Sequence, residues 1–191
     1  EITKHLFPYE IIEKYSKTSS EYWKNYNPAQ IQPDLEAMWN GLEDYIQGVQ
    51  SNTIIIADVS GSMEGRPMDT SIGLAIYFAE RNTGPFRNKF MTFSDNPSWI
   101  SLPENSTLKD KINITADAYW DGSTNLEAAF DLILNVAVKN KLAQEDLPKN
   151  LVIITDMEFN RCVSDNNTTV SNWGGKATNM TFYDQMKAKY A

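Results

Sequence analysis

Hydrophobic residues follow two different spacings along this chain, and the two spacings alternate. Short runs rich in β-branched and aromatic residues predict buried strands. These strands are expected at 53–58, 89–93, 98–102 and 151–155. Elsewhere, apolar residues that recur every three or four positions predict helices. These helices are expected at 8–16, from Pro33 to about 47, from Pro67 to about 80, and at 124–138.

The alternation of strands and helices predicts the fold class. Such an order gives a mostly parallel sheet with helices on both faces. Only residues 94–97, with Asp95-Asn96-Pro97 as the turn, separate the strands at 89–93 and 98–102. So short a connection means that they must pair antiparallel. We therefore expect an α/β fold, Rossmann-like and doubly wound, with one antiparallel edge strand.

The chain is expected to have two regions. Residues 1–50 form a helical arm or the end of a preceding helical domain, and residues 51–191 form the α/β domain. Residues 107–114 predict a short helical turn, 160–175 a long polar loop and 181–190 another helix. Because that last helix should lead into a further strand, we expect the final strand or strands to be missing and the parent protein to be longer at both ends.

Composition narrows the class of protein. A length of 191 residues, of which 41% are apolar, is enough for one domain with a full core. The net charge of −8 argues against general binding of nucleic-acid phosphates by this fragment. Cys162 is the one cysteine, and neither a secretory segment nor a long apolar run occurs. We therefore expect a soluble, cytoplasmic protein that does not contact membranes.

Oxygen-bearing side chains follow two predicted strands and precede one helix. Asp58, Ser60 and Ser62 leave the first strand, Thr124 opens the helix at 124, and Asp156 leaves the last strand. Ligands of open α/β sheets bind at the carboxyl ends of strands, so these side chains are expected to converge. An all-oxygen set suits Mg²⁺, with Mn²⁺ or Ca²⁺ as alternatives. Taken alone, Asp58 could instead cap its own loop, with the serines in turns.

The same motif resembles the metal-ion-dependent adhesion site of von Willebrand factor A domains. Asp-x-Ser-x-Ser, a later Thr in a Gly-containing loop and an Asp after a buried strand occur in that order over residues 52–191. The resemblance implies a Rossmann-like sheet and a metal set of Asp58, Ser60, Ser62, Thr124 and Asp156. Asp121 stands where a glycine is common. Its extra carboxylate would either alter the charge balance at the metal or simply face solvent, and we favour solvent. Glu158 either supports the metal ligands from behind or is an ordinary surface residue, and we favour the second.

A narrower resemblance involves five short segments. They are Phe-Pro-Tyr-Glu-Ile at 7–11, Asp-Val-Ser-Gly-Ser-Met at 58–63, Thr-Phe-Ser-Asp-Asn-Pro at 92–97, Phe-Asp-Leu-Ile-Leu at 130–134 and Thr-Asp-Met-Glu-Phe at 155–159. These segments are similar to an uncharacterised family that pairs an N-terminal helical region with a C-terminal von Willebrand A module. Its layout is similar to that of the Ro ribonucleoprotein (TROVE) family, in which the helical ring binds RNA and the A module does not.

The function expected from these residues is binding rather than catalysis. A cation bound at Asp58 would leave one position for the carboxylate of a protein partner. An alternative is that the fragment is the half of a Ro-like ribonucleoprotein that does not contact RNA. A metal-dependent phosphohydrolase of the haloacid type needs a second Asp two positions after the first, where this chain has Ser60. His5 is the only histidine, which argues against a Ser–His triad. We therefore expect no enzymatic activity.

Overall fold

A computed structural model describes residues 6–16, 30–47, 53–94, 96–118 and 126–156 of the chain. The predicted loop at 160–175 and the predicted helix at 181–190 lie outside the described residues. All elements named below belong to the described part of the chain.

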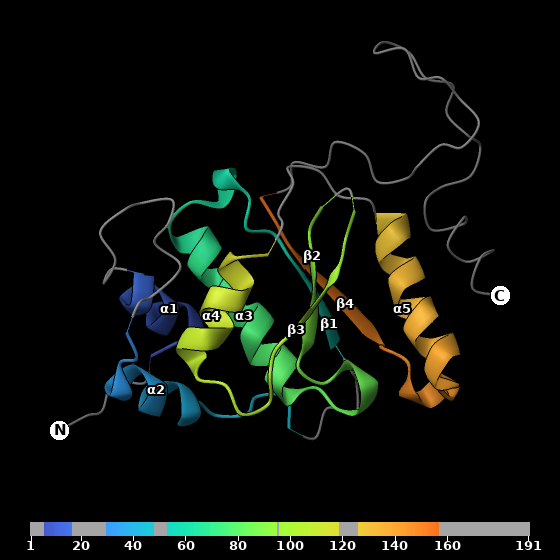
Figure 1. Cartoon of the computed structure of the whole chain (residues 1–191), viewed down its shortest axis with the longest axis horizontal. Helices are drawn as coiled ribbons and strands as arrows, with labels where there is room; N and C mark the ends of the chain where they lie inside the picture. Colours follow the sequence, from blue (N-terminus) through green and yellow to red (C-terminus); the bar gives the residue numbers. More distant parts are fainter. Residues whose placement is uncertain (1–5, 17–29, 48–52, 95, 119–125, 157–191) are drawn as a thin grey trace, which may run out of the picture.

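The described strands form one mixed sheet in the order β3-β2-β1-β4 (Figure 1). β1 (Thr53–Ala57) pairs in parallel with β2 (Lys89–Thr92) on one side and with β4 (Asn150–Ile154) on the other. β3 (Trp99–Ser101) pairs antiparallel with β2. The predicted α/β class, the mostly parallel sheet and the antiparallel edge strand are thereby confirmed.

Five α-helices accompany the sheet in the described residues. They are α1 (Pro8–Ser16), α2 (Pro33–Asn40), α3 (Arg66–Arg81), α4 (Leu108–Ala116) and α5 (Leu126–Asn140). Short 3₁₀ turns lie at η1 (Gly61–Met63), η2 (Gly84–Phe86) and η3 (Gln144–Asp146). α2 and α3 both have a proline in the first turn, where the missing amide proton does not disturb the helix.

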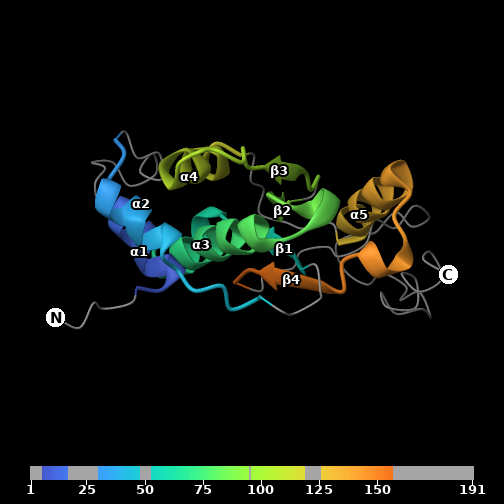
Figure 2. The ribbon, with the colours of Figure 1, turned by 90° about the horizontal axis from the view of Figure 1, so that it is seen from below.

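Helices lie on both faces of the sheet (Figure 2). Ile55 and Ala57 of β1 belong to a core cluster that contains buried residues of α1, α2, α3 and α4. The alternate residues, Ile54 and Ile56, belong to a second cluster with α5. All five residues of β1 are buried, as expected for a strand that is covered on both sides.

The predicted helix from Pro33 to about 47 is wrong in length, because α2 ends at Asn40. The apolar spacing continues past that residue, but Met38 and Tyr45 are 45% and 71% exposed, whereas Trp39 is buried. Side chains of α3 bind the peptide groups that a longer helix would have used. The Tyr77 hydroxyl donates to the Glu43 carbonyl and accepts the Tyr45 amide proton. The chain after α2 therefore has its hydrogen bonds without remaining helical.

α4 is more regular than the short turn predicted at 107–114. Thr107 and Asp110 form a capping box, in which each side chain accepts the backbone amide proton of the other. Such a box satisfies two of the four amides left unpaired at a helix start. The result is a nine-residue helix that extends to Ala116.

Within the described residues, no helix is both long enough and apolar enough to cross a membrane.

Candidate metal centre

Asp58 lies at the point where β1 ends beside β4. Its backbone amide donates to the Ile154 carbonyl at 2.9 Å, one step beyond the last residue of β1. The residue is 2% exposed. Because β1 and β4 are parallel neighbours, the residues that follow them lie at the same edge of the sheet. This edge, where β1, β2 and β4 end, is called the carboxyl edge below.

The Asp58 carboxylate is held by two neutral donors. One oxygen, Oδ1, accepts the Ser60 amide proton at 2.8 Å, and Oδ2 accepts the Thr155 hydroxyl proton at 2.9 Å. Among the described residues, no lysine or arginine forms an ion pair with Asp58. A buried carboxylate normally has a charged partner or a metal. Asp58 has no charged partner among the described residues, so its negative charge is available to a cation at the carboxyl edge.

Ser60 and Ser62 present a pair of hydroxyls beside this carboxylate. Their Oγ atoms lie 3.1 Å apart, and the pair is exposed. Two neighbouring ligands of an octahedral Mg²⁺, each about 2.1 Å from the ion, are about 3.0 Å apart. The two hydroxyls thus already have the separation that a shared magnesium ion requires.

The loop that carries these side chains, residues 58–65, is fixed at both ends. The Met63 amide donates to the Ser60 carbonyl at 3.0 Å, and the Met63 side chain is buried in the core cluster of α1–α4. Gly65 has a φ of 85°, a conformation that other residues rarely adopt. α3 begins directly afterwards, so the loop lies between a central strand and a long helix.

The other predicted metal ligands are placed only in part. Asp156 is exposed and directly follows Thr155, so it lies at the carboxyl edge. Thr124, Asp121 and Glu158 lie outside the described residues. In the described ranges, no three His, Cys, Asp or Glu side chains gather at a point where they could hold a metal. The predicted set of metal ligands, however, has only two carboxylates, and its other members are hydroxyls.

Sequence reasoning did not single out Thr155, which bonds directly to Asp58. It also assigned no role to hydroxyls at the end of β2. Thr92 Oγ1 accepts the Ser98 amide proton at 3.0 Å and lies 3.5 Å from Ser94 Oγ. Thr92 and Ser94 are fully buried. Polar residues at the ends of otherwise apolar strands were the available signal, because ligand sites of such sheets lie there.

Residues 52–191 match the family described as a domain of unknown function (DUF7788). The chain belongs to this family. The DUF7788 match contains the four described strands, the loop at 58–65 and α3, α4 and α5. It begins after α1 and α2.

A curated relative extends the comparison beyond the DUF7788 match. An "Uncharacterized protein L728" from Acanthamoeba polyphaga mimivirus is 37% identical over 162 residues. The aligned part is 84% of this chain but 26% of the viral protein, so the chain spans about a quarter of the length of this relative. No solved structure matches the chain.

Proposed function

We propose that the carboxyl edge binds a divalent cation, Mg²⁺ in the first place, and that the cation bridges this domain to an acidic group of a protein partner. Asp58, Ser60, Ser62, Thr124 and Asp156 would hold the ion. The observation that carries the proposal is the buried Asp58 carboxylate, which has two neutral donors and no cationic partner among the described residues.

The donor set fits a hard cation better than a transition metal. Carboxylate and hydroxyl oxygens suit Mg²⁺, Mn²⁺ and Ca²⁺, whereas zinc sites use mainly Cys and His. The 3.1 Å separation of the serine hydroxyls fits neighbouring positions on one ion. When bound, the ion would supply a positive charge with an exchangeable position, which is a means of binding carboxylates. The resemblance to metal-ion-dependent adhesion sites supports the same function.

Binding is favoured over hydrolysis because of Ser60. A serine cannot replace the second aspartate that donates and accepts the proton in haloacid-type phosphatases. In this structure the Ser60 amide positions Asp58, and the Ser60 hydroxyl lies beside Ser62. The Ser60 amide therefore orients the Asp58 carboxylate, and the Ser60 hydroxyl is one of the proposed metal ligands. In the Ro-like alternative, this chain would be the half of a ribonucleoprotein that does not contact RNA, and RNA contact would belong to another region.

The first test is the effect of the cation on stability. We expect Mg²⁺ or Mn²⁺ to raise the melting temperature and EDTA to lower it, because a ligand that binds only the folded state stabilises it by about 2.7 kcal/mol at a hundred times its Kd. Asp58→Ala should abolish the difference, and Ser62→Ala should reduce it. Ser106→Ala is the matched control, since the Ser106 hydroxyl bonds only locally, to the Pro103 carbonyl.

The second test is the effect of the cation on binding. Poly-L-glutamate should bind the wild-type protein in Mg²⁺ but not in EDTA, and it should not bind Asp58→Ala under either condition. An equal response of wild type and Asp58→Ala to the metal would show that the site is assigned wrongly. Turnover of p-nitrophenyl phosphate that depends on both Mg²⁺ and Asp58 would instead establish the hydrolase alternative.

A further inference from the structure

α1 and α2 contact a surface of the DUF7788 domain that is shaped to receive them. The N-terminal segment is defined here as residues 6–16 and 30–47. Ile11, Ile12 and Tyr15 of α1, with Leu35 and Trp39 of α2, are buried in the same core cluster as α3 and α4. α1 packs against α3, and α2 lies beside α1 in both views of the ribbon (Figures 1 and 2).

Gly73 of α3 lies where α1 comes close to α3, and its lack of a side chain leaves room for this contact. A Cβ atom added at Gly73 would lie 3.1 Å from the Pro8 carbonyl carbon, 3.2 Å from the Tyr9 nitrogen and 3.3 Å from an Ile12 side-chain carbon. Two of these three neighbours are backbone atoms, which cannot easily move away. A glycine in the middle of a helix costs about 1 kcal/mol relative to alanine. Here it permits the start of α1 to approach α3 closely.

Glu36 of α2 completes the start of α4. Its two carboxylate oxygens accept the amide protons of Leu108 at 2.8 Å and Lys109 at 3.0 Å. The capping box satisfies the amides of Thr107 and Asp110. The four amides left unpaired at the start of this helix are therefore shared equally between local side chains and one residue of the N-terminal segment. Tyr15 of α1 also donates its hydroxyl proton to Glu36, at 2.5 Å.

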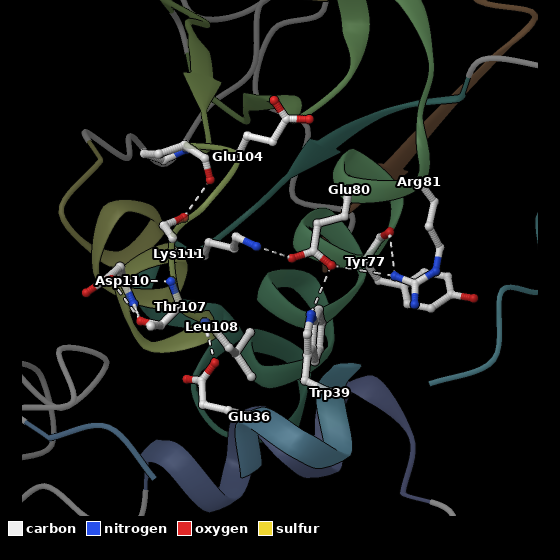
Figure 3. Close-up of polar contacts among 12 residues, drawn as sticks. Glu36, Trp39, Tyr77, Glu80, Arg81, Glu104, Thr107, Leu108, Asp110 and Lys111 are labelled. Carbon is white, nitrogen blue, oxygen red and sulfur yellow. Dashed lines mark hydrogen bonds and ion pairs between the residues drawn. The ribbon is translucent and has the colours of Figure 1, made fainter. Parts of the chain in front are cut away.

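Trp39 of α2 joins a buried ion pair between α3 and α4 (Figure 3). Glu80 accepts a proton from Lys111 Nζ at 2.6 Å through one oxygen, and from Trp39 Nε1 at 2.9 Å through the other. The side chains of Lys111 and Glu80 are only 11% and 18% exposed. Burial of an ion pair is favourable only when the remaining hydrogen bonds are also made, and Trp39 makes one of them.

Arg81 holds the chain that follows α2. Its guanidinium lies 3.8 Å from the centre of the Tyr77 ring and donates to the Leu42 carbonyl at 3.3 Å. Asp44 lies 3.8 Å from the same guanidinium. Together with the Tyr77 hydroxyl, these contacts fix residues 42–45 against α3. The N-terminal segment is therefore bound at α1, at α2 and at the turn beyond α2.

We infer that the N-terminal segment is a permanent part of the folding unit, and that this surface of α3 and α4 is an intramolecular interface whose partner is residues 6–16 and 30–47 of the same chain. The cooperative unit thus includes residues well before the DUF7788 match, which begins at 52. The alignment with the mimivirus protein covers 84% of the chain. Residues 52–191 make up a smaller share of the chain, so the alignment must extend into the N-terminal segment. A preceding helical domain that merely touches the sheet domain would not need Gly73, Glu36 and Trp39 in these places.

Native-state hydrogen exchange on the whole chain tests this inference directly. We expect the amides of Ile11 and Ile12 in α1 and of Ile55 and Ile56 in β1 to exchange through the same global unfolding, with the same dependence on denaturant. Glu36→Gln should reduce protection of both sets of amides by the same factor, about tenfold or more. Gly73→Ala should do the same.

Glu104→Gln is the matched control. Glu104 forms an exposed ion pair with Arg87, with side chains 67% and 55% exposed, and such pairs contribute little. Exchange in this variant should match the wild type. If Glu36→Gln fails to fold while Glu104→Gln folds, the segment is required for folding, as inferred. If α1 amides exchange by a separate, easier opening and Glu36→Gln leaves β1 protection unchanged, the segment is an independent unit and the inference is wrong.

Discussion

Carboxylates near the two ends of α3 have different kinds of partners. At the C-terminal end, Glu80 has Lys111, Trp39 and, at 3.6 Å, Arg81 as partners. Before the N-terminal end, Asp58 has the Ser60 amide and the Thr155 hydroxyl. Both side chains are largely shielded from solvent, and α3 is about 24 Å long. One carboxylate is paired with two cations, and the other, among the described residues, with none.

This difference separates a structural site from a binding site. The charge of Glu80 is already balanced by cations, so a further cation would add little. Removal of Glu80 would leave the buried Lys111 without its partner. A carboxylate held only by neutral donors remains attractive to an added cation. Three experiments change one side of this comparison at a time, from the largest expected effect to the smallest.

The largest effect is expected when Glu80 is removed. Glu80→Leu should lower the free energy of unfolding by about 3–5 kcal/mol, because Lys111 then remains buried and charged without its partner. The double variant Glu80→Leu with Lys111→Met should recover much of that loss, since an apolar pair of similar volume removes the unpaired charge. Chemical denaturation measures both values. Equal stability of the single and double variants would mean that the pair is solvated and not a structural centre.

An intermediate effect is expected at Thr155. Thr155→Val keeps the shape of the side chain but removes the proton donated to Asp58, so it should lower stability without metal by about 1 kcal/mol. It should also weaken the stabilisation by Mg²⁺, because Asp58 loses the group that orients it. Thr70→Val is the control, since the Thr70 hydroxyl bonds only within its own helix. Thermal melts with and without Mg²⁺ decide; an unchanged metal response in Thr155→Val would exclude a positioning role.

The smallest effect is expected at Asp110, on the structural side. The hydrogen bond from the Thr107 hydroxyl, followed by lesser contacts, lowers the pKa of Asp110 below its ordinary value. A lowered pKa in the folded state adds stability above the ordinary pKa, and this stability is lost as the pH falls through the folded value. The side chain is 46% exposed, so solvent reduces the effect to less than about 0.5 kcal/mol. Asp110→Asn should therefore show a slightly smaller loss of stability than wild type between pH 5 and pH 2, and an equal or larger loss would contradict this role.

Most of the fold could be predicted because it depends on local patterns. β1 was expected at 53–58 and lies at Thr53–Ala57, since a run of isoleucines identifies a strand buried on both faces. The end of α2 could not be predicted in this way. The apolar spacing continues beyond Asn40, and the side chains that replace the helical hydrogen bonds, Tyr77 and Arg81, come more than 30 residues later.

The candidate site follows the same division. The spacing of Asp58, Ser60 and Ser62 is local, and the predicted proximity of the ends of β1 and β4 is confirmed by their pairing. The bond between Thr155 and Asp58 joins residues 97 positions apart, so it depends on the register of two strands and on a side-chain conformation. Thr124, which the sequence placed at the same edge, stays a prediction because it lies outside the described residues.

The order of strands also has a consequence for the timing of folding. β1 is made early, but one of its two neighbours, β4, ends almost 100 residues later. Pairings between distant segments form slowly, because a long loop must close before any contact compensates for its entropy. During synthesis, one face of β1 can be covered by α1, α2 and α3, and one edge of β1 can pair with β2, which in turn pairs with β3. The other edge of β1 stays unpaired until β4 has been made. We therefore expect the contacts of Asp58 to be among the last that form during folding. Binding of a cation at Asp58 would then indicate that the sheet is complete.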